Sequence, residues 1–150
     1  MKTLIKWVGG LVLAVVAMGG FFTFRTPTHL YRFTGEFAGC PARPSCVSSV
    51  AADAHAIAPL DYQGAPDAAL ERLIQIVADQ PGARIEHRDG RYLHAVFLTP
   101  RMRYHDDVEL LVQPDGKIQV RSISRFGYGD HGVNRARVET LRAAFAETAG

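Results

Sequence analysis

The chain has 150 residues, about the length of one domain. Its 47% hydrophobic and 21% charged residues are close to ordinary globular usage, which excludes collagen-like, coiled-coil and wholly disordered proteins. Lys2, Lys6 and Arg25 flank the first apolar run, so the rest of the chain carries 14 basic residues against 15 acidic ones. Because a nucleic-acid-binding protein needs a concentrated basic face, we expect no nucleic-acid partner.

The N-terminal segment, residues 1–26, has the pattern of a membrane anchor or a signal segment. Residues 7–24 are 18 uncharged positions, and a helix of that length spans about 27 Å, close to the thickness of the hydrocarbon layer. Lys2 and Lys6 precede the run, as in both anchors and secretory signals. We expect residues 7–24 to cross the membrane once, with the C-terminal domain exported to the periplasmic side. Secretion after signal cleavage and a buried helix are the alternatives.

Cys40 and Cys46 are the only cysteines. In an oxidising compartment such a pair typically forms a disulfide, which here would close a seven-residue loop containing two prolines. Unpaired thiols are the alternative. A metal site would need further ligands, and His29 and His55 do not have a zinc-type spacing. The spacing also differs from the C-x-x-C of thiol oxidoreductases.

Residues 27–61 hold prolines, glycines and small residues without a sustained period, so we expect an extended wrap around the disulfide loop. A helix is predicted to begin near Pro66, because proline suits the first helical position, and to end before Pro81. Its apolar residues recur on one face: Leu70, Leu73, Ile74 and Val77.

Two hairpins and a closing helix are predicted next. The hairpins cover residues 83–99 and 107–126, with turn signals at residues 88–90 and 114–116. The helix covers residues 134–148, with apolar positions on one side. Strands joined by hairpins are antiparallel, and two amphipathic helices need an apolar face to cover.

We therefore predict an α+β protein. An N-terminal membrane helix is followed by a two-layer sandwich of a four-stranded antiparallel sheet with two helices, in the order αββββα. The predicted domain organisation is residues 1–26 as anchor or signal, residues 27–61 as the wrap with the disulfide loop, and residues 62–150 as the α+β domain.

The second hairpin also predicts which side chains share a face. If Gln113 pairs with Lys117, the strand register is fixed. The helix-covered face then holds Leu93, Ala95, Phe97, Val108, Leu110, Val112, Ile118 and Val120. The other face holds His94, Val96, Glu109, Leu111, Arg121, Ile123 and Arg125. Such a mixture is unusual for a solvent face, so we expect it to contact the wrap, a membrane surface or a partner.

Residues 121–139 combine glycines, serines and arginines at a strand-to-helix turn. The candidate ligand-binding residues are Arg121, Ser122, Ser124, Arg125, Asp130, Asn134 and Arg135, together with Asp106, Asp107, Glu109 and His94. In one interpretation, Asn134 or Asp130 caps the last helix, and its backbone donors join Arg121, Arg125 and Arg135 in binding an anion. In the other, the network is structural: Arg121 pairs with Glu109, and Arg125 pairs with Asp107 or Asp130.

Catalytic and metal patterns fit poorly. Ser122 and Ser124 lie on a strand without a G-x-S-x-G elbow, although His94 could in principle reach one of them. His105, Asp107 and Glu109 alternate onto one side of a strand, but an arginine beside Glu109 would compete with a cation. We expect no catalytic residue, no cofactor and no metal.

Four stretches of the chain carry a resemblance to a known family. They are Cys40-Pro41 through Cys46-Val47-Ser48-Ser49, Tyr92-Leu93-His94-Ala95, Asp106-Asp107-Val108-Glu109, and Arg121-Ser122-Ile123-Ser124-Arg125 running into Gly132-Val133-Asn134-Arg135. Across roughly residues 39–141 the chain resembles the bacterial and plastid family known as domain-of-unknown-function family 1499. The resemblance implies an exported or membrane-associated domain and brings no known activity.

The sequence thus predicts a membrane-anchored cell-envelope protein that acts as a binding or interaction module through the polar region from Arg121 to Asn134. Its expected partners are the membrane and an anionic small molecule or an envelope protein. The alternative is an envelope hydrolase that uses Ser124, or a carboxylate, with His94. A third interpretation makes the polar network purely structural.

Overall fold

The computed structural model describes residues 2–148. Within these residues the chain forms four helices: α1 (Lys2–Phe24), α2 (Tyr31–Thr34), α3 (Pro66–Ala78) and α4 (Val133–Glu147). It also forms six strands: β1 (Cys46–Ser48), β2 (Leu60–Asp61), β3 (Ala83–Asp89), β4 (Tyr92–Leu98), β5 (His105–Val112) and β6 (Lys117–Ser124).

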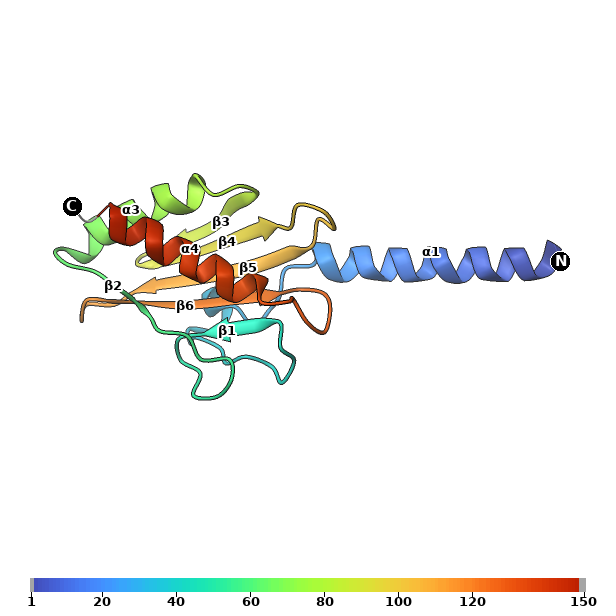
Figure 1. Ribbon diagram of the computed structural model, residues 1–150, viewed down its shortest axis with the longest axis horizontal. Coiled ribbons are helices and arrows are strands. Elements are labelled where there is room, and N and C mark those ends of the chain that lie inside the picture. Colours follow the sequence, from blue (N-terminus) through green and yellow to red (C-terminus); the bar gives the residue numbers. More distant parts are fainter. Residues whose placement is uncertain (1, 149–150) are drawn as a thin grey trace.

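The strands make one antiparallel sheet in the order β1-β6-β5-β4-β3, and β2 also pairs with β6. β1 and β2 therefore follow one another along the edge of β6 that β5 leaves open. Figure 1 shows α3 and α4 lying across one face of this sheet, while α1 projects beyond its end. The predicted α+β class is confirmed.

The predicted four-stranded sheet is wrong, because the sheet has six strands in the described residues. β1 and β2 come from the segment that was predicted to be an extended wrap, and they are only three and two residues long. Strands this short show no alternation of apolar and polar residues, so periodicity cannot reveal them. Their partners on β6 define them: Cys46 pairs with Ile123, and Leu60 pairs with Ile118.

The predicted membrane anchor is also corrected by the structure. α1 is helical, but none of the helices in residues 2–148 is both long enough and apolar enough to cross a membrane. This finding contradicts the single-span anchor and the exported topology that followed from it.

The hairpin register is as the sequence predicted, with Glu109 opposite Arg121 and Leu110 opposite Val120. The eight residues assigned to the helix-covered face are all buried in one hydrophobic core. α3 and α4 cover it through apolar residues three or four positions apart, such as Leu70 and Leu73 in α3. Val47 and Leu60 from the short strands belong to the same core. Residues 46–61 are thus part of the packed structure.

Gly82 precedes β3 in a backbone conformation that would strain any residue with a Cβ atom. Its φ is +74°, and an added Cβ would lie 2.7 Å from the backbone oxygen of Leu98. We expect Gly82→Ala to lower the free energy of unfolding by at least about 1–2 kcal/mol, measured by urea denaturation. Gly39→Ala is the control, because Gly39 lies outside the left-handed region and has nothing within 4 Å of the added atom. Equal stabilities of the two variants would contradict this account.

Candidate functional site

The predicted site residues are divided between the two faces of the sheet. Successive residues of a strand point to opposite faces, so Asp106 and Ser124 lie on the helix-covered side, while Asp107 and Arg125 lie on the other side. We call Asp106, Ser122, Ser124, Asn134 and Arg137 the helix-side cluster. We call His94, Asp107, Glu109, Arg121 and Arg125 the back-face cluster. All ten are buried except Arg125 and Arg137, whose side chains are only 6% and 10% exposed.

Glu109 is at the centre of the back-face cluster. Its Oε2 accepts a hydrogen bond from Nη1 of Arg121 at 2.7 Å. Its Oε1 accepts from the Tyr92 hydroxyl at 2.9 Å and from the backbone N–H of Tyr31 at 2.7 Å. Burial and the neighbouring Glu109 raise the pKa of Tyr92, so the hydroxyl keeps its proton and remains a donor. Three donors thus compensate one buried carboxylate.

Asp107 holds the second ion pair of the back face. It accepts hydrogen bonds from Nε and Nη2 of Arg125 at 2.9 and 2.8 Å, and it contacts Nε2 of His94 at 2.7 Å. Burial by itself raises the pKa of Asp107, but the hydrogen bonds from Arg125 and His94 outweigh it and hold the pKa below its usual value. The carboxylate is therefore charged at neutral pH.

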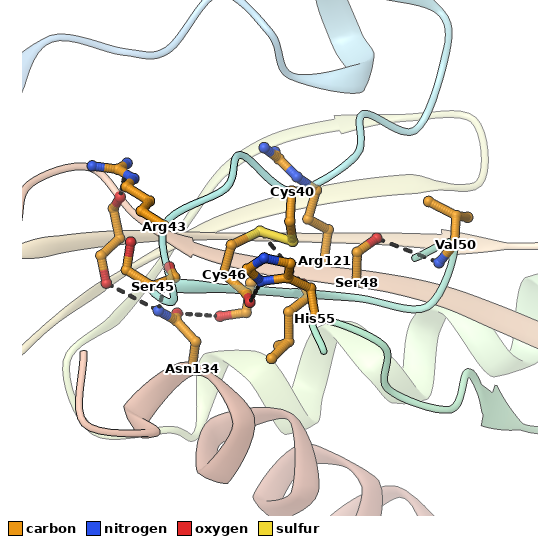
Figure 2. Close-up of a disulfide and its surroundings, with 12 residues drawn as sticks. Cys40, Arg43, Ser45, Cys46, Ser48, Val50, His55, Arg121 and Asn134 are labelled. Carbon is orange, nitrogen blue, oxygen red and sulfur yellow. Dashed lines mark hydrogen bonds between the residues drawn. A yellow bond between two sulfur atoms is a disulfide. The ribbon is translucent and has the colours of Figure 1, made fainter. Parts of the chain in front are cut away.

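Asn134 is the hub of the helix-side cluster. Its Oδ1 accepts from the Ser122 hydroxyl and from Nη1 of Arg137, both at 2.6 Å. Its Nδ2 donates to the Ser124 hydroxyl at 2.9 Å and to the backbone oxygen of Ser45 at 3.1 Å. Figure 2 shows the Asn134 side chain reaching from α4 toward Ser45, on the opposite side of the strand from the Arg121 guanidinium and the disulfide. One amide thus joins α4, β6 and the residue before β1.

The start of α4 already holds a carboxylate. Asp130 accepts hydrogen bonds from the backbone N–H groups of Asn134 at 2.8 Å and Gly132 at 3.0 Å. An anion at a helix start needs such donors to be open. The structure also does not bring the three predicted arginines together here. Arg121 and Arg125 lie on the back face, and Arg135 donates to the backbone oxygens of residues 54 and 56.

The geometry does not assemble the serine form of the hydrolase considered from the sequence. Ser124 and His94 lie on opposite faces of the sheet, and the Ser124 hydroxyl bonds to Asn134 rather than to an imidazole. His94 does pair with the carboxylate of Asp107, but both side chains are fully buried. Over residues 2–148, no three His, Cys, Asp or Glu side chains are grouped as metal ligands.

The predicted disulfide is confirmed. Cys40 and Cys46 are bonded, with their Cα atoms 5.7 Å apart. Figure 2 shows that the bond ties the preceding loop to β1. Within this loop, Arg43 donates to the backbone oxygens of Ser124 at 2.7 Å and Gly127 at 2.9 Å. The disulfide loop is therefore attached to the end of β6, where both polar clusters meet.

One cavity near these clusters was not predicted from the sequence. We call it the loop cleft: a cavity of about 700 Å³ between the β4–β5 loop, residues 99–104, and the segment that leads into α4, residues 126–133. Asp106 and Ser124 line it from the sheet. Loops carry no periodic signal, and only the glycines of residues 126–133 hinted at an unusual turn here.

The family membership is clear. Residues 36–145 match the family model described as "Protein of unknown function (DUF1499)", and the chain belongs to this family. The match confirms the resemblance seen in the sequence and covers both clusters and the disulfide. No curated protein matches the chain.

The buried pair of Arg121 and Glu109 gives a stability prediction. We expect Arg121→Met to lower the free energy of unfolding by about 3–5 kcal/mol, because the Glu109 carboxylate would stay buried without its cation. The double variant Arg121→Met/Glu109→Met leaves no unpaired charge, so its loss should be smaller than the sum of the single losses. Urea denaturation measures all of these values. Arg135→Met, at an exposed arginine, is the control. Additive losses in the double variant would refute the coupling.

The lowered pKa of Asp107 gives a pH dependence. A carboxyl group whose pKa is lower in the folded state stabilises the fold above its unfolded pKa, about 3.9, and loses that contribution as pH falls through the folded pKa. We expect the stability gap between wild type and Asp107→Asn to be full at pH 7 and to shrink below about pH 4. Denaturant unfolding over this pH range tests it, with the exposed Asp61→Asn as control. A gap that does not change with pH would contradict the assignment.

Proposed function

We propose that the protein is a binding module that takes a small amphipathic molecule into the loop cleft, beside the polar region from Arg121 to Asn134. The proposed ligand has an apolar or aromatic body and a hydrogen-bond donor at one end. The proposal rests on one observation: a single cavity has exposed apolar side chains in its walls and a buried carboxylate that lacks one hydrogen-bond partner. Its volume of about 700 Å³ is in the range of small-molecule sites.

The walls of the loop cleft are more apolar than a solvent-facing loop requires. Met102 is 65% exposed, and Phe126 and Val133 are also exposed. The rings of Tyr104 and Phe126 pack with their centroids 5.6 Å apart, which links the two loops. Exposed apolar side chains gathered around one cavity are characteristic of a ligand site.

Asp106 provides a polar group for the ligand's donor. It is buried, and its Oδ2 accepts from Nη2 of Arg137 at 2.6 Å. Its Oδ1 has no hydrogen-bond partner among residues 2–148. An unpaired buried carboxylate oxygen is costly and rare in folded proteins. An ammonium or hydroxyl group of a bound molecule would supply the missing donor.

Backbone strain is concentrated in the same two loops. Arg103 in the first loop and His131 in the second both have φ of +52°, and they are the only non-glycine residues with positive φ in the described part of the chain. Each such conformation costs on the order of 1–3 kcal/mol. Strain of this kind persists where the surrounding structure has a use for the loop shape, which supports a binding role for this end of the molecule.

The probe for the test is 2-phenylethylamine, which has an aromatic ring and an ammonium donor. We expect its titration into the full-length ¹⁵N-labelled protein to give saturable NMR shifts confined to residues 99–106 and 124–133. Val133→Ser removes part of the apolar wall and should weaken binding at least about threefold. Val50→Ser is the matched control, because Val50 is equally exposed but does not line the cleft. Shifts spread over the whole surface, or equal affinities of the two variants, would count against the proposal.

A further inference from the structure

A second cavity lies on the other side of the end of β6. Its volume is about 370 Å³, and its lining comes from the stretch between α1 and α2, the disulfide loop and the sheet. The lining includes Arg25, His29, Arg43, Asp107, Ser124 and Arg125. We call it the arginine pocket. It is separate from the loop cleft, with which it shares only Ser124.

We propose that the arginine pocket binds a phosphate group, either as the free ion or as the head of a small phosphate monoester. Its lining contains three arginines and one carboxylate, that of Asp107. Asp107 is paired with Arg125, so it does not balance the charge of Arg43. A phosphate monoester carries about −1.5 to −2 at pH 7 and would be attracted to that charge. The planar guanidinium also matches phosphate oxygens with paired N–H donors.

Arg43 is the source of uncompensated charge. Its two hydrogen bonds run to the backbone oxygens of Ser124 and Gly127, and within residues 2–148 it makes no salt bridge. The carbonyls fix the direction of the guanidinium without neutralising it. An arginine positioned in this way is organised for an anion before the anion arrives.

Arg125 and Asp107 form the buried part of the pocket. Arg125 is held by two hydrogen bonds to the Asp107 carboxylate, which His94 also contacts. The carboxylate therefore has its lone pairs engaged by neighbours within the protein. Arg25, in contrast, is exposed at the outer side of the pocket. The positive charge thus extends from the buried sheet to the surface, along a path that a charged group can follow from solvent.

His29 completes the lining without adding a fixed charge. Desolvation and then the nearby Arg121 lower its pKa, while Glu109 and Asp107 act in the opposite direction. The imidazole is consequently neutral at neutral pH and can donate one N–H. Arg121 and Glu109 neutralise each other, so neither changes the charge balance of the pocket.

Isothermal titration calorimetry on the full-length chain tests the inference, with inorganic phosphate and glycerol 3-phosphate as separate probes. We expect saturable 1:1 binding of at least one of them. Tighter binding of glycerol 3-phosphate would assign the site to phosphate monoesters, and equal or weaker binding would assign it to the free ion. No saturable binding of either probe would overturn the proposal.

Arg43→Gln should weaken phosphate binding by about tenfold or more, because it removes a charged donor. Arg135→Gln is the matched control: Arg135 also bonds to two backbone oxygens, and the variant loses the same charge outside the pocket. Equal weakening in both variants would mean diffuse attraction and would overturn the proposal. Arg25→Gln, at an exposed position, should also weaken binding, and it decides the question if Arg43→Gln fails to fold. Val133→Ser should leave phosphate binding unchanged, so this site can fail or succeed independently of the loop cleft.

Discussion

The rest of the structure depends on the burial of charge on the back face of the sheet. Arg121 and Glu109 are fully buried cross-strand neighbours, and a buried carboxylate is tolerated only when its lone pairs are filled. One of the required donors is the backbone N–H of Tyr31, far away in sequence. Because the buried Glu109 carboxylate needs this N–H, the segment that contains Tyr31 must lie against the back face of the sheet. The disulfide then holds the end of that segment against β1.

The helix-covered face is stabilised by a different kind of polar interaction. There the polar groups are mostly neutral amides and hydroxyls, and Asn134 satisfies them by joining α4 to β6 and to Ser45. Because Asp130 occupies the start of α4, this face has no open anion site at the helix terminus. Its free space lies instead between the two flanking loops, where the lining is apolar. Positive charge and apolar surface are thus separated by the thickness of one sheet.

The sequence predicted the α+β class, the disulfide, the hairpin register and the apolar core, because alternation and a tight turn at Gly116 leave little freedom. It did not predict β1 and β2, whose identity as strands comes from pairing with β6. It also treated Ser124 and Arg125 as one site, although adjacent strand residues face opposite ways. The predicted anchor is contradicted, because no helix in residues 2–148 is both long enough and apolar enough to cross a membrane. Both cavities depend on loop paths, and no periodicity encodes those.

The pairing of β1 with β6 has a further consequence for folding. Cys46 and Ile123 are partners in the sheet, yet they are 77 positions apart in the chain. Contacts of such high sequence separation form slowly, because the entropy of closing the intervening loop must be overcome first. During synthesis from the N-terminus, residues 36–48 emerge long before β6 exists to receive them. Cys40 and Cys46 are only six positions apart, so their disulfide can form before β6 has been synthesised. The covalent loop can therefore be complete before the edge of the sheet that it joins has been made.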